Sequence, residues 1–218
     1  KEDTENFLID IDFLGIHNVV ALRGDAVKTE TYFKPEKNGH AFAKDLVEQI
    51  VKMNHGTYLD ESLENSACTD FNIGVAGYPE KHMEAASLEQ DIYHLKKKVE
   101  AGADYIVTQM FFDNQKYYDF VEKCRTSGIN VPIIPGLKPI TTKSQLSMIP
   151  HRFKVDLPNE LVIAIAKAKD NKEVKEIGIN WCIQQSKDLM KNGAPVLHYY
   201  SMGKSEVVKR IASEVFKD

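Results

Sequence analysis

Strands and helices alternate along this sequence, and that alternation constrains the fold more than any other feature. Largely apolar runs such as 71–76 and 105–108 stand between segments whose apolar residues repeat every three or four positions. Such runs are typical of strands buried on both faces, and the segments between them are typical of covering helices. The strand ends near 76, 108 and 135 are about 30 residues apart, the length of one strand–helix unit. The sequence therefore predicts a parallel α/β sheet.

The expected elements follow this alternation from the first helix to the last. Strands are expected over residues 16–22, 71–76, 105–108, 131–135 and 195–200. Helices are expected over 4–15, 41–53, 158–169, 172–191 and 205–216, after caps at Ser87 and Asp113, and from Thr141 or Thr142 to Met148. Residues 26–40 and 54–70 are polar and are expected to form loops. Five strands are predicted, with extra helices before the last one.

The helix after Ser87 carries the clearest signals. Ser87 and Gln90 have the spacing of a capping box, in which each side chain bonds a backbone N–H at the helix start. An apolar stripe then repeats at four, three and four residues through Leu88, Ile92, Leu95 and Val99. Lysines fall in its last turns, where cations complement the helix dipole.

Composition excludes several classes of protein. The 218 residues carry a net charge of −4, so no basic excess indicates nucleic-acid binding. No apolar run approaches the roughly 20 residues of a membrane span. The 3 cysteines are widely spaced and include no Cys-x-x-Cys pair, which argues against a disulfide framework or a structural zinc site. The chain is expected to be one cytoplasmic domain.

Polar and aromatic residues gather where the predicted strands end. They are Arg23, Gly24, Asp25, Tyr78, Glu80, His82, Gln109, His198 and Lys204. In a (β/α)₈ barrel such positions meet at one face, where active sites lie. No residues have the spacing of a metal site, a nucleophile elbow or a Gly-rich phosphate loop. The set suits a large, polar, planar ligand, although Asp25 could simply cap a turn and His82 could be a surface residue.

Five strings in order resemble the methylenetetrahydrofolate reductase family. They are residues 21–25 (ALRGD), 77–82 (GYPEKH), 108–113 (TQMFFD), 134–136 (IPG) and 198–200 (HYY). The resemblance covers about residues 5–215. It implies an FAD-containing (β/α)₈ TIM barrel that reduces 5,10-methylenetetrahydrofolate to 5-methyltetrahydrofolate with NADH or NADPH, in one-carbon metabolism and methionine synthesis.

The resemblance also implies roles for individual residues. FAD contacts are expected at Arg23, Gly24, Asp25, Ala43, Tyr78, His82, Asp91, His94, Lys97 and Lys98. Folate contacts are expected at Asp25, Gln109, Gln145 and Lys204, with Gln109 shared by the nicotinamide. Asp25 is the expected catalytic residue, since it would tune the flavin and face the folate. No metal is expected.

The chain departs from the family pattern at three places. His94 and Lys97 replace an asparagine and an arginine found in some relatives, and Lys204 replaces an arginine. The family's first three strands and its general-acid glutamate lie upstream of the sequence given. Residues 1–218 are therefore expected to form an incomplete barrel of one domain that is inactive by itself. The resemblance also implies a homo-oligomer. The alternatives are an aldolase-like lyase that binds a phosphorylated sugar and a non-catalytic barrel.

Overall fold

The computed structural model describes residues 1–26, 33–203 and 205–217. These divide into two compact units. The first comprises Lys1–Ala76 and His94–Ile106, and the second comprises Gly77–Tyr93 and Val107–Asp218. Four strands form a sheet in the order β1 (Asn18–Ala21), β2 (Asn72–Gly77), β3 (Tyr105–Thr108) and β4 (Ile133–Ile134), and β5 (Gly136–Leu137) pairs with β6 (His198–Tyr199). The prediction of a single domain stays a prediction.

The first unit is built around the pairing of its first two strands. Its elements are α1 (Glu2–Phe13), β1 (Asn18–Ala21), α2 (Ala43–Asn54), most of β2 (Asn72–Gly77), the second half of α3 (Leu88–Glu100) and the start of β3 (Tyr105–Thr108). β1 runs parallel to β2, with Asn18 opposite Asn72 and Ala21 opposite Val75. The predicted strand 105–108 is confirmed with the same bounds.

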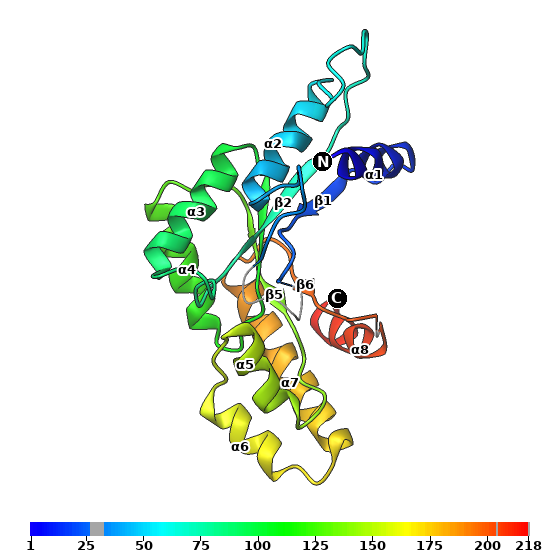
Figure 1. Ribbon diagram of the computed structural model, residues 1–218. Helices are drawn as coiled ribbons and strands as arrows, with labels where there is room; N and C mark the ends of the chain where they lie inside the picture. The colour runs from blue at the N-terminus through cyan, green and yellow to red at the C-terminus, as the bar shows by residue number, and fades with distance from the viewer. Residues whose placement is uncertain (27–32, 204, 218) are drawn as a thin grey trace. The chain divides into compact units, whose positions relative to one another are not determined.

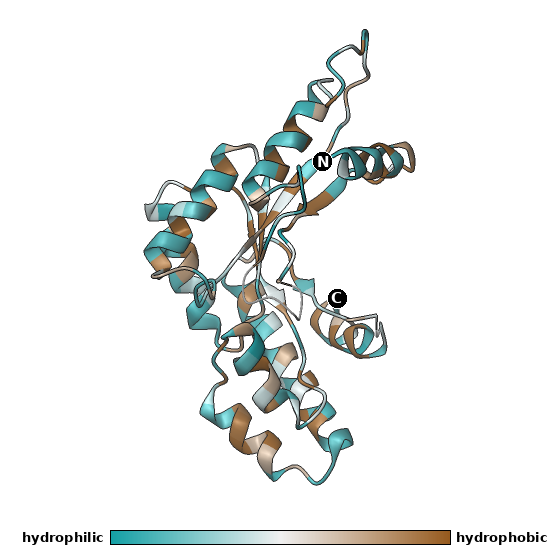
Figure 2. Cartoon of the chain, in the orientation of Figure 1, coloured by the Kyte–Doolittle hydropathy of each residue, from teal (hydrophilic) through white to brown (hydrophobic). Residues whose placement is uncertain are grey.

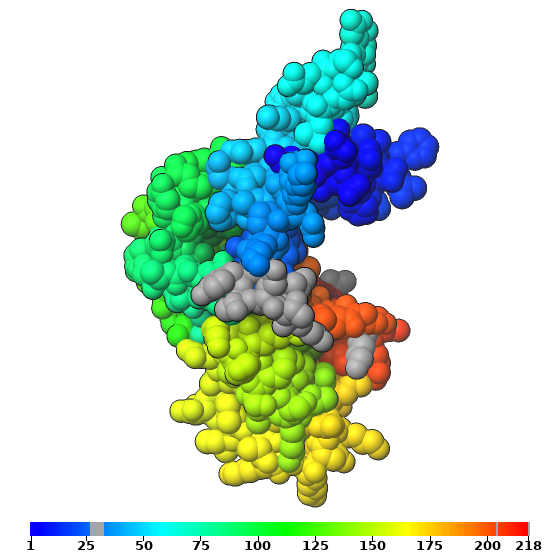
Figure 3. All heavy atoms as spheres, in the orientation of Figure 1, coloured from blue at the N-terminus to red at the C-terminus, as the bar shows by residue number. Residues whose placement is uncertain are grey.

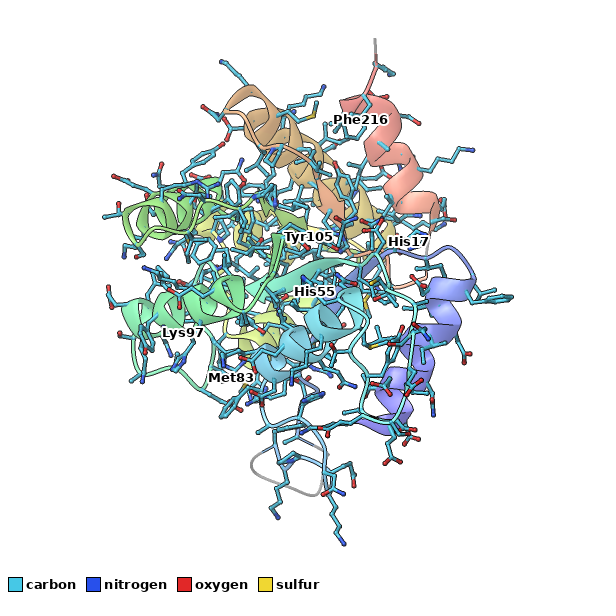
Figure 4. All side chains as sticks on the ribbon, turned by 90° about the horizontal axis from the view of Figure 1, so that it is seen from above. His17, His55, Met83, Lys97, Tyr105 and Phe216 are labelled. Carbon is cyan, nitrogen blue, oxygen red and sulfur yellow. The ribbon has the colours of Figure 1, made fainter. Side chains whose placement is uncertain are left out.

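A glycine lets an aromatic ring lie across this pairing. A Cβ at Gly74 would stand 2.4 Å from the ring of Tyr105, so only glycine leaves room for the ring. The Tyr105 hydroxyl reaches β1 and donates to the Val19 carbonyl at 3.1 Å (Figure 4). Buried side chains of α2, Ile50 and Met53 among them, belong to the core of this unit.

The apolar stripe of α1 is mostly exposed. Leu8 is its buried residue, whereas Phe7 is 61% exposed and Leu14, just past the helix, is 70% exposed. Hydrophobic positions on α1 are visible in Figure 2, and its side chains project from the unit in Figure 3. A helix was correctly predicted, but its periodicity does not mark a buried face here.

The second unit places most of its helices around a separate apolar core. Its elements include α4 (Asn114–Thr126), β4 (Ile133–Ile134), β5 (Gly136–Leu137), α5 (Gln145–Phe153), α6 (Asn159–Lys167), α7 (Asn171–Lys191), β6 (His198–Tyr199) and α8 (Ser205–Val215). α5, α6 and α7 gather at one end (Figure 1). Their core includes the buried residues Met110, Phe112, Ile140, Ile149, Val155, Leu161, Ile165, Ala168 and Val174.

The strand predicted over 131–135 is present but shorter, and a second strand that was not predicted follows it. β4 ends at Ile134, and Gly136 begins β5, which runs parallel to β6 with Gly136 opposite His198. Pro135 has no N–H to continue a ladder, and its carbonyl instead accepts from His198 N at 3.0 Å. The described residues therefore contain six strands instead of the predicted five.

Two of the predicted helix caps are present in the structure, and the third is different. Asp113 accepts from Gln115 N at 2.9 Å, as predicted. Ser87 accepts from Gln90 N at 3.2 Å, but the Gln90 side chain takes the N–H of Ala86 instead of completing the box. α5 begins at Gln145 and ends at Phe153, later than the predicted helix to Met148. In the described residues, no helix has both the length and the apolarity needed to cross a membrane.

Candidate functional site

The most elaborately built strand end is the turn that follows β2. Lys81 N donates to the Tyr78 carbonyl at 3.1 Å, which closes a turn over Tyr78, Pro79, Glu80 and Lys81. Lys81 has a φ of 78°, a left-handed conformation uncommon for a residue with a side chain. Its ammonium offsets that strain by donating to the carbonyls of His82 and Ala85 at 3.2 and 2.6 Å.

The turn presents two rings and is joined to α3. The rings of Tyr78 and His82 meet edge to face, with centroids 4.6 Å apart. Asp91, in the first turn of α3, accepts from His82 N through Oδ2 at 2.8 Å. The structure thus brings together three residues expected to contact FAD, and their carboxylate–backbone bond fixes the turn to the helix start.

Glu80 extends from the same turn toward two other elements. Its Oε2 accepts from Asp156 N at 3.1 Å, in the connection between α5 and α6. The Lys116 ammonium of α4 lies 3.9 Å from Oε2. Burial raises the pKa of Glu80 to about 7, helped by the negative charge of Asp156 and opposed by the Asp156 N–H and by Lys116. Glu80 was expected at a strand end, but this contact spans 76 residues and no local pattern indicates it.

Gln109 lies at the neighbouring strand end. Its N–H donates to the Gly77 carbonyl at 2.8 Å, so the residue after β3 adjoins the start of the β2 turn. Its side-chain Oε1 accepts from Met110 N at 3.0 Å. This bond orients the amide group, whose NH₂ can donate to a ligand.

Thr108, the last residue of β3, is hydrogen-bonded to Gly136 at the start of β5 and to Tyr200 just after β6. Its hydroxyl accepts from Gly136 N at 2.9 Å, and its carbonyl accepts from the Tyr200 hydroxyl at 2.8 Å. A Cβ at Gly136 would lie 2.1 Å from the Thr108 carbonyl oxygen, so this approach requires glycine. Tyr200 also meets the ring of His198 at 4.8 Å between centroids, and burial lowers the pKa of His198.

The Gln145 side chain bonds the backbone just ahead of α5. Its Oε1 accepts from Thr141 N at 2.7 Å and from Thr142 N at 3.0 Å. The predicted cap is therefore reversed, because the glutamine inside the helix bonds the residues ahead of it. Its carbonyl oxygen is engaged, so the expected folate contact falls to its NH₂ group.

The remaining predicted residues belong to the first unit or lie outside the described residues. Arg23 stacks on the Phe33 ring at 4.9 Å, Gly24 lies beside that ring, and Asp25 is exposed. Ala43 begins α2. Lys204 lies outside the described residues.

The cations and the histidine of α3 differ in their surroundings. Lys98 donates to the Ala76 carbonyl at 2.6 Å, next to the end of β2. Lys97 pairs with Glu100 at 2.7 Å on the outward side of α3 (Figure 4), and His94 is exposed.

Other chemistries receive little support from the described residues. They contain no group of three His, Cys, Asp or Glu placed to hold a metal ion. Cys124 and Cys182 are buried free thiols, and burial raises the pKa of each to about 12. Such thiols are poor nucleophiles.

The sequence model described as methylenetetrahydrofolate reductase matches residues 1–215. The chain belongs to the methylenetetrahydrofolate reductase family. It is 37% identical over 211 residues to methylenetetrahydrofolate reductase (NADH) 1 of Arabidopsis thaliana, covering 92% of this chain and 33% of the relative. It is 34% identical over 194 residues to 5,10-methylenetetrahydrofolate reductase of Escherichia coli, covering 88% of this chain and 58% of the relative.

A third relative adds a different reductant in its name. The probable methylenetetrahydrofolate reductase (NADPH) of Caenorhabditis elegans is 33% identical over 215 residues, which cover 97% of this chain and 30% of the relative. The chain thus spans about a third of the length of its plant and animal relatives. A solved Clostridium thermocellum protein that binds two copies of 5-methyl-5,6,7,8-tetrahydrofolic acid overlaps 66% of this chain and 52% of its own, with 19% identity and a TM-score of 0.45.

Membership of the methylenetetrahydrofolate reductase family confirms the predicted fold class. The parallel strands and covering helices are those of an incomplete TIM barrel. In such barrels the carboxyl ends of the strands carry the active site. Tyr78 and Gln109 follow the carboxyl ends of β2 and β3, and Asp91 supports the first of these.

Proposed function

We propose that this chain supplies flavin- and folate-binding parts of an FAD-dependent methylenetetrahydrofolate reductase. The reaction would convert 5,10-methylenetetrahydrofolate to 5-methyltetrahydrofolate with NADH or NADPH as reductant. The family match over residues 1–215 carries this proposal. The relatives are named for both NADH and NADPH, so the proposal includes either reductant.

The built turn fits a planar cofactor of this kind. The turn that carries the edge-to-face pair of Tyr78 and His82 is joined to α3 through Asp91, and aromatic rings are good platforms for a flat ring system. In the first unit, Arg23, Lys97 and Lys98 supply cations suited to phosphate. We infer that FAD contacts these residues together with Gly24, Asp25, Ala43 and His94. When bound, the flavin would supply the hydride chemistry that amino-acid side chains lack.

The remaining polar groups would orient the folate. The oriented amide of Gln109 can donate to a pterin or to a nicotinamide carboxamide. Asp25 would accept from the donors of the pterin, and its carboxylate would disfavour extra negative charge nearby. The NH₂ of Gln145 could donate to the folate, and Lys204 would attract the anionic tail of folate.

We also propose the activity of the 218-residue chain alone, and the oligomeric state and location of the protein. The 218-residue chain alone would be inactive, because apolar side chains of α1 and β1 lack cover in this structure. The full-length protein would form a homo-oligomer. It would work in the cytoplasm, where free thiols such as Cys68, Cys124 and Cys182 stay reduced.

The absorbance spectrum of the purified full-length protein tests the cofactor directly. A yellow flavin spectrum that survives gel filtration is expected. A colourless protein that FAD cannot reconstitute would refute the proposal and would favour a non-catalytic barrel or an aldolase-like lyase.

Asp91→Ala sharpens the test within the site. Removing the acceptor of the His82 N–H loses a charged hydrogen bond worth about 1.5–3 kcal/mol, or about tenfold to a hundredfold in FAD affinity. Asp119→Ala, on the exposed side of α4, is the matched control and should leave affinity unchanged. Equal FAD affinity in the two variants would remove Asp91 from the site.

A further inference from the structure

Glu80 is the residue through which the turn after β2 reaches the rest of its unit. It lies between Tyr78 and His82, the two residues that face each other as rings. Its side chain does not join that ring pair but extends to Asp156 and toward Lys116. Glu80 is two positions from each ring residue along the chain, so a change at its carboxyl would be transmitted to both rings.

The two oxygens of the carboxyl have unequal surroundings. Oε2 accepts from Asp156 N at 3.1 Å, whereas Oε1 is buried and has no hydrogen-bond partner among the described residues. The side chain is 8% exposed, so water gives little compensation. A buried carboxylate normally has donors at both oxygens, and an ionised group without them is unfavourable.

The charges that face Glu80 come from two elements packed against its turn. The Asp156 carboxylate opposes a second negative charge, and the Lys116 ammonium of α4 favours one. Lys116 is shared, since it lies 3.6 Å from Asp156 Oδ2 and 3.9 Å from Glu80 Oε2. The cation therefore offsets only part of the cost of ionising Glu80.

We propose that Glu80 is the positioning residue of the Tyr78–His82 turn, and that this turn keeps its ligand-ready shape when the carboxyl carries a proton. Ionisation of Glu80 would favour a looser turn in which the carboxylate reaches water. The affinity for a planar ligand on Tyr78 and His82 then falls as the pH rises from acidic to neutral. The ligand half of this inference rests on the proposed flavin site, whereas the turn half does not.

The sign follows from the protonation of the two turn conformations. In the observed turn the pKa of Glu80 is about 7, whereas an exposed glutamate has its usual value near 4.5. The observed turn therefore binds the proton more tightly than a loosened turn. The observed turn is favoured below pH 4.5 by the full difference, and this advantage is lost as the pH rises from 4.5 to about 7.

Two measurements on the full-length protein test the inference between pH 5.5 and pH 8.5. Hydrogen exchange reports the Asp156 and His82 amides without any ligand, and fluorescence titration gives the FAD dissociation constant. We expect the wild-type affinity to fall by up to about thirtyfold across this range, because one proton changes the equilibrium at most tenfold per pH unit and the loss runs over about 1.5 units, from pH 5.5 to about 7. Glu80→Gln mimics the protonated acid and should remove most of that pH dependence.

Charge variants provide a sign test that does not require changing Glu80. Asp156→Asn keeps the backbone donor but removes a negative charge, so the midpoint of the pH dependence should move to lower pH. Lys116→Met removes the cation, so the midpoint should move to higher pH. Glu160→Gln, an exposed residue of α6 with the same change of charge as Glu80→Gln, should not move it.

The outcomes separate this inference from the proposed function. A wild-type pH dependence that persists in Glu80→Gln, or midpoints that move the same way in Asp156→Asn and Lys116→Met, would overturn it. If Glu80→Gln does not fold, the two charge variants still decide the question. If no variant binds FAD but exchange of the Asp156 amide follows the expected pH dependence, the flavin proposal fails and the role of Glu80 stands.

Discussion

Two helices of this chain, α6 and α1, each have an apolar face, but the two faces differ in how far they are buried. In α6, Leu161 is 1% and Ile165 is 0% exposed, and both belong to the core shared with α5 and α7. In α1, Leu8 is 4% exposed but Phe13 is 90% exposed. Helical periodicity therefore establishes that a helix has an apolar face, but it does not establish that the face has a partner.

Apolar residues in and just after β1 are also exposed. Val20 of β1 is 42% exposed and Leu22 is 57% exposed, although strands of parallel sheets are usually covered on both faces. β1 is also the terminal strand of its sheet. An exposed apolar surface of this kind usually marks an interface. It supports the proposal that the 218 residues alone do not make an active enzyme.

Gly178→Ala should be the most damaging change on the packed side of the comparison. A Cβ at this position of α7 would lie 1.8 Å from the Ile140 carbonyl oxygen, so the helix would have to move. We expect a loss of more than about 3 kcal/mol in the free energy of unfolding, measured by urea denaturation. Gly193→Ala is the control, because it has open space and a φ of 83°, and it should cost about 1 kcal/mol. Equal losses would show that α7 is not tightly packed on residue 140.

Ile165→Ala and Phe13→Ala test the comparison directly. Truncating the fully buried Ile165 should cost about 3 kcal/mol. Truncating the exposed Phe13 should change stability by less than about 0.5 kcal/mol. Both values come from the same denaturation assay on the 218-residue chain. A large loss for Phe13→Ala would show that α1 is covered in solution, and the contrast between the two helices would disappear.

Asp170→Ala should have a smaller effect at the start of α7. Its carboxylate accepts from Lys172 N and Glu173 N, both at 2.9 Å. Losing such a cap costs about 1 kcal/mol. Asp170→Ser should recover most of that loss in a thermal denaturation series, because a serine hydroxyl also caps. A loss in Asp170→Ser equal to that in Asp170→Ala would argue against capping as the reason.

Local signals in the sequence predicted much of the fold. The strand 105–108 and the Asp113 cap depend on neighbouring residues, and both are confirmed. β5 was missed because two residues are too few for a period, and because its pairing with β6 depends on residues 62 positions apart, Gly136 and His198. The exposure of Phe13 depends on what lies opposite α1, which periodicity cannot report.

The candidate site also has parts that could be predicted from the sequence and parts that could not. Tyr78 and His82 were placed together by their position at a strand end, and Asp91 by the resemblance to the family. The task of Glu80 depends on Asp156 and Lys116, which are distant in sequence, so no local pattern could reveal it. The structural bond of Gln145 to Thr141 and Thr142 reversed an expected cap because a side chain inside the helix supplied the acceptor.

The central claim is tested most directly by product analysis of the full-length protein beside the 218-residue chain. Each would be mixed with FAD, 5,10-methylenetetrahydrofolate and either NADH or NADPH, and 5-methyltetrahydrofolate would be measured by mass spectrometry. We expect product that depends on FAD and on the reductant from the full-length protein, and none from the 218-residue chain. A flavin-free full-length protein that forms no product would contradict the function, and robust turnover by the 218-residue chain would contradict its incompleteness.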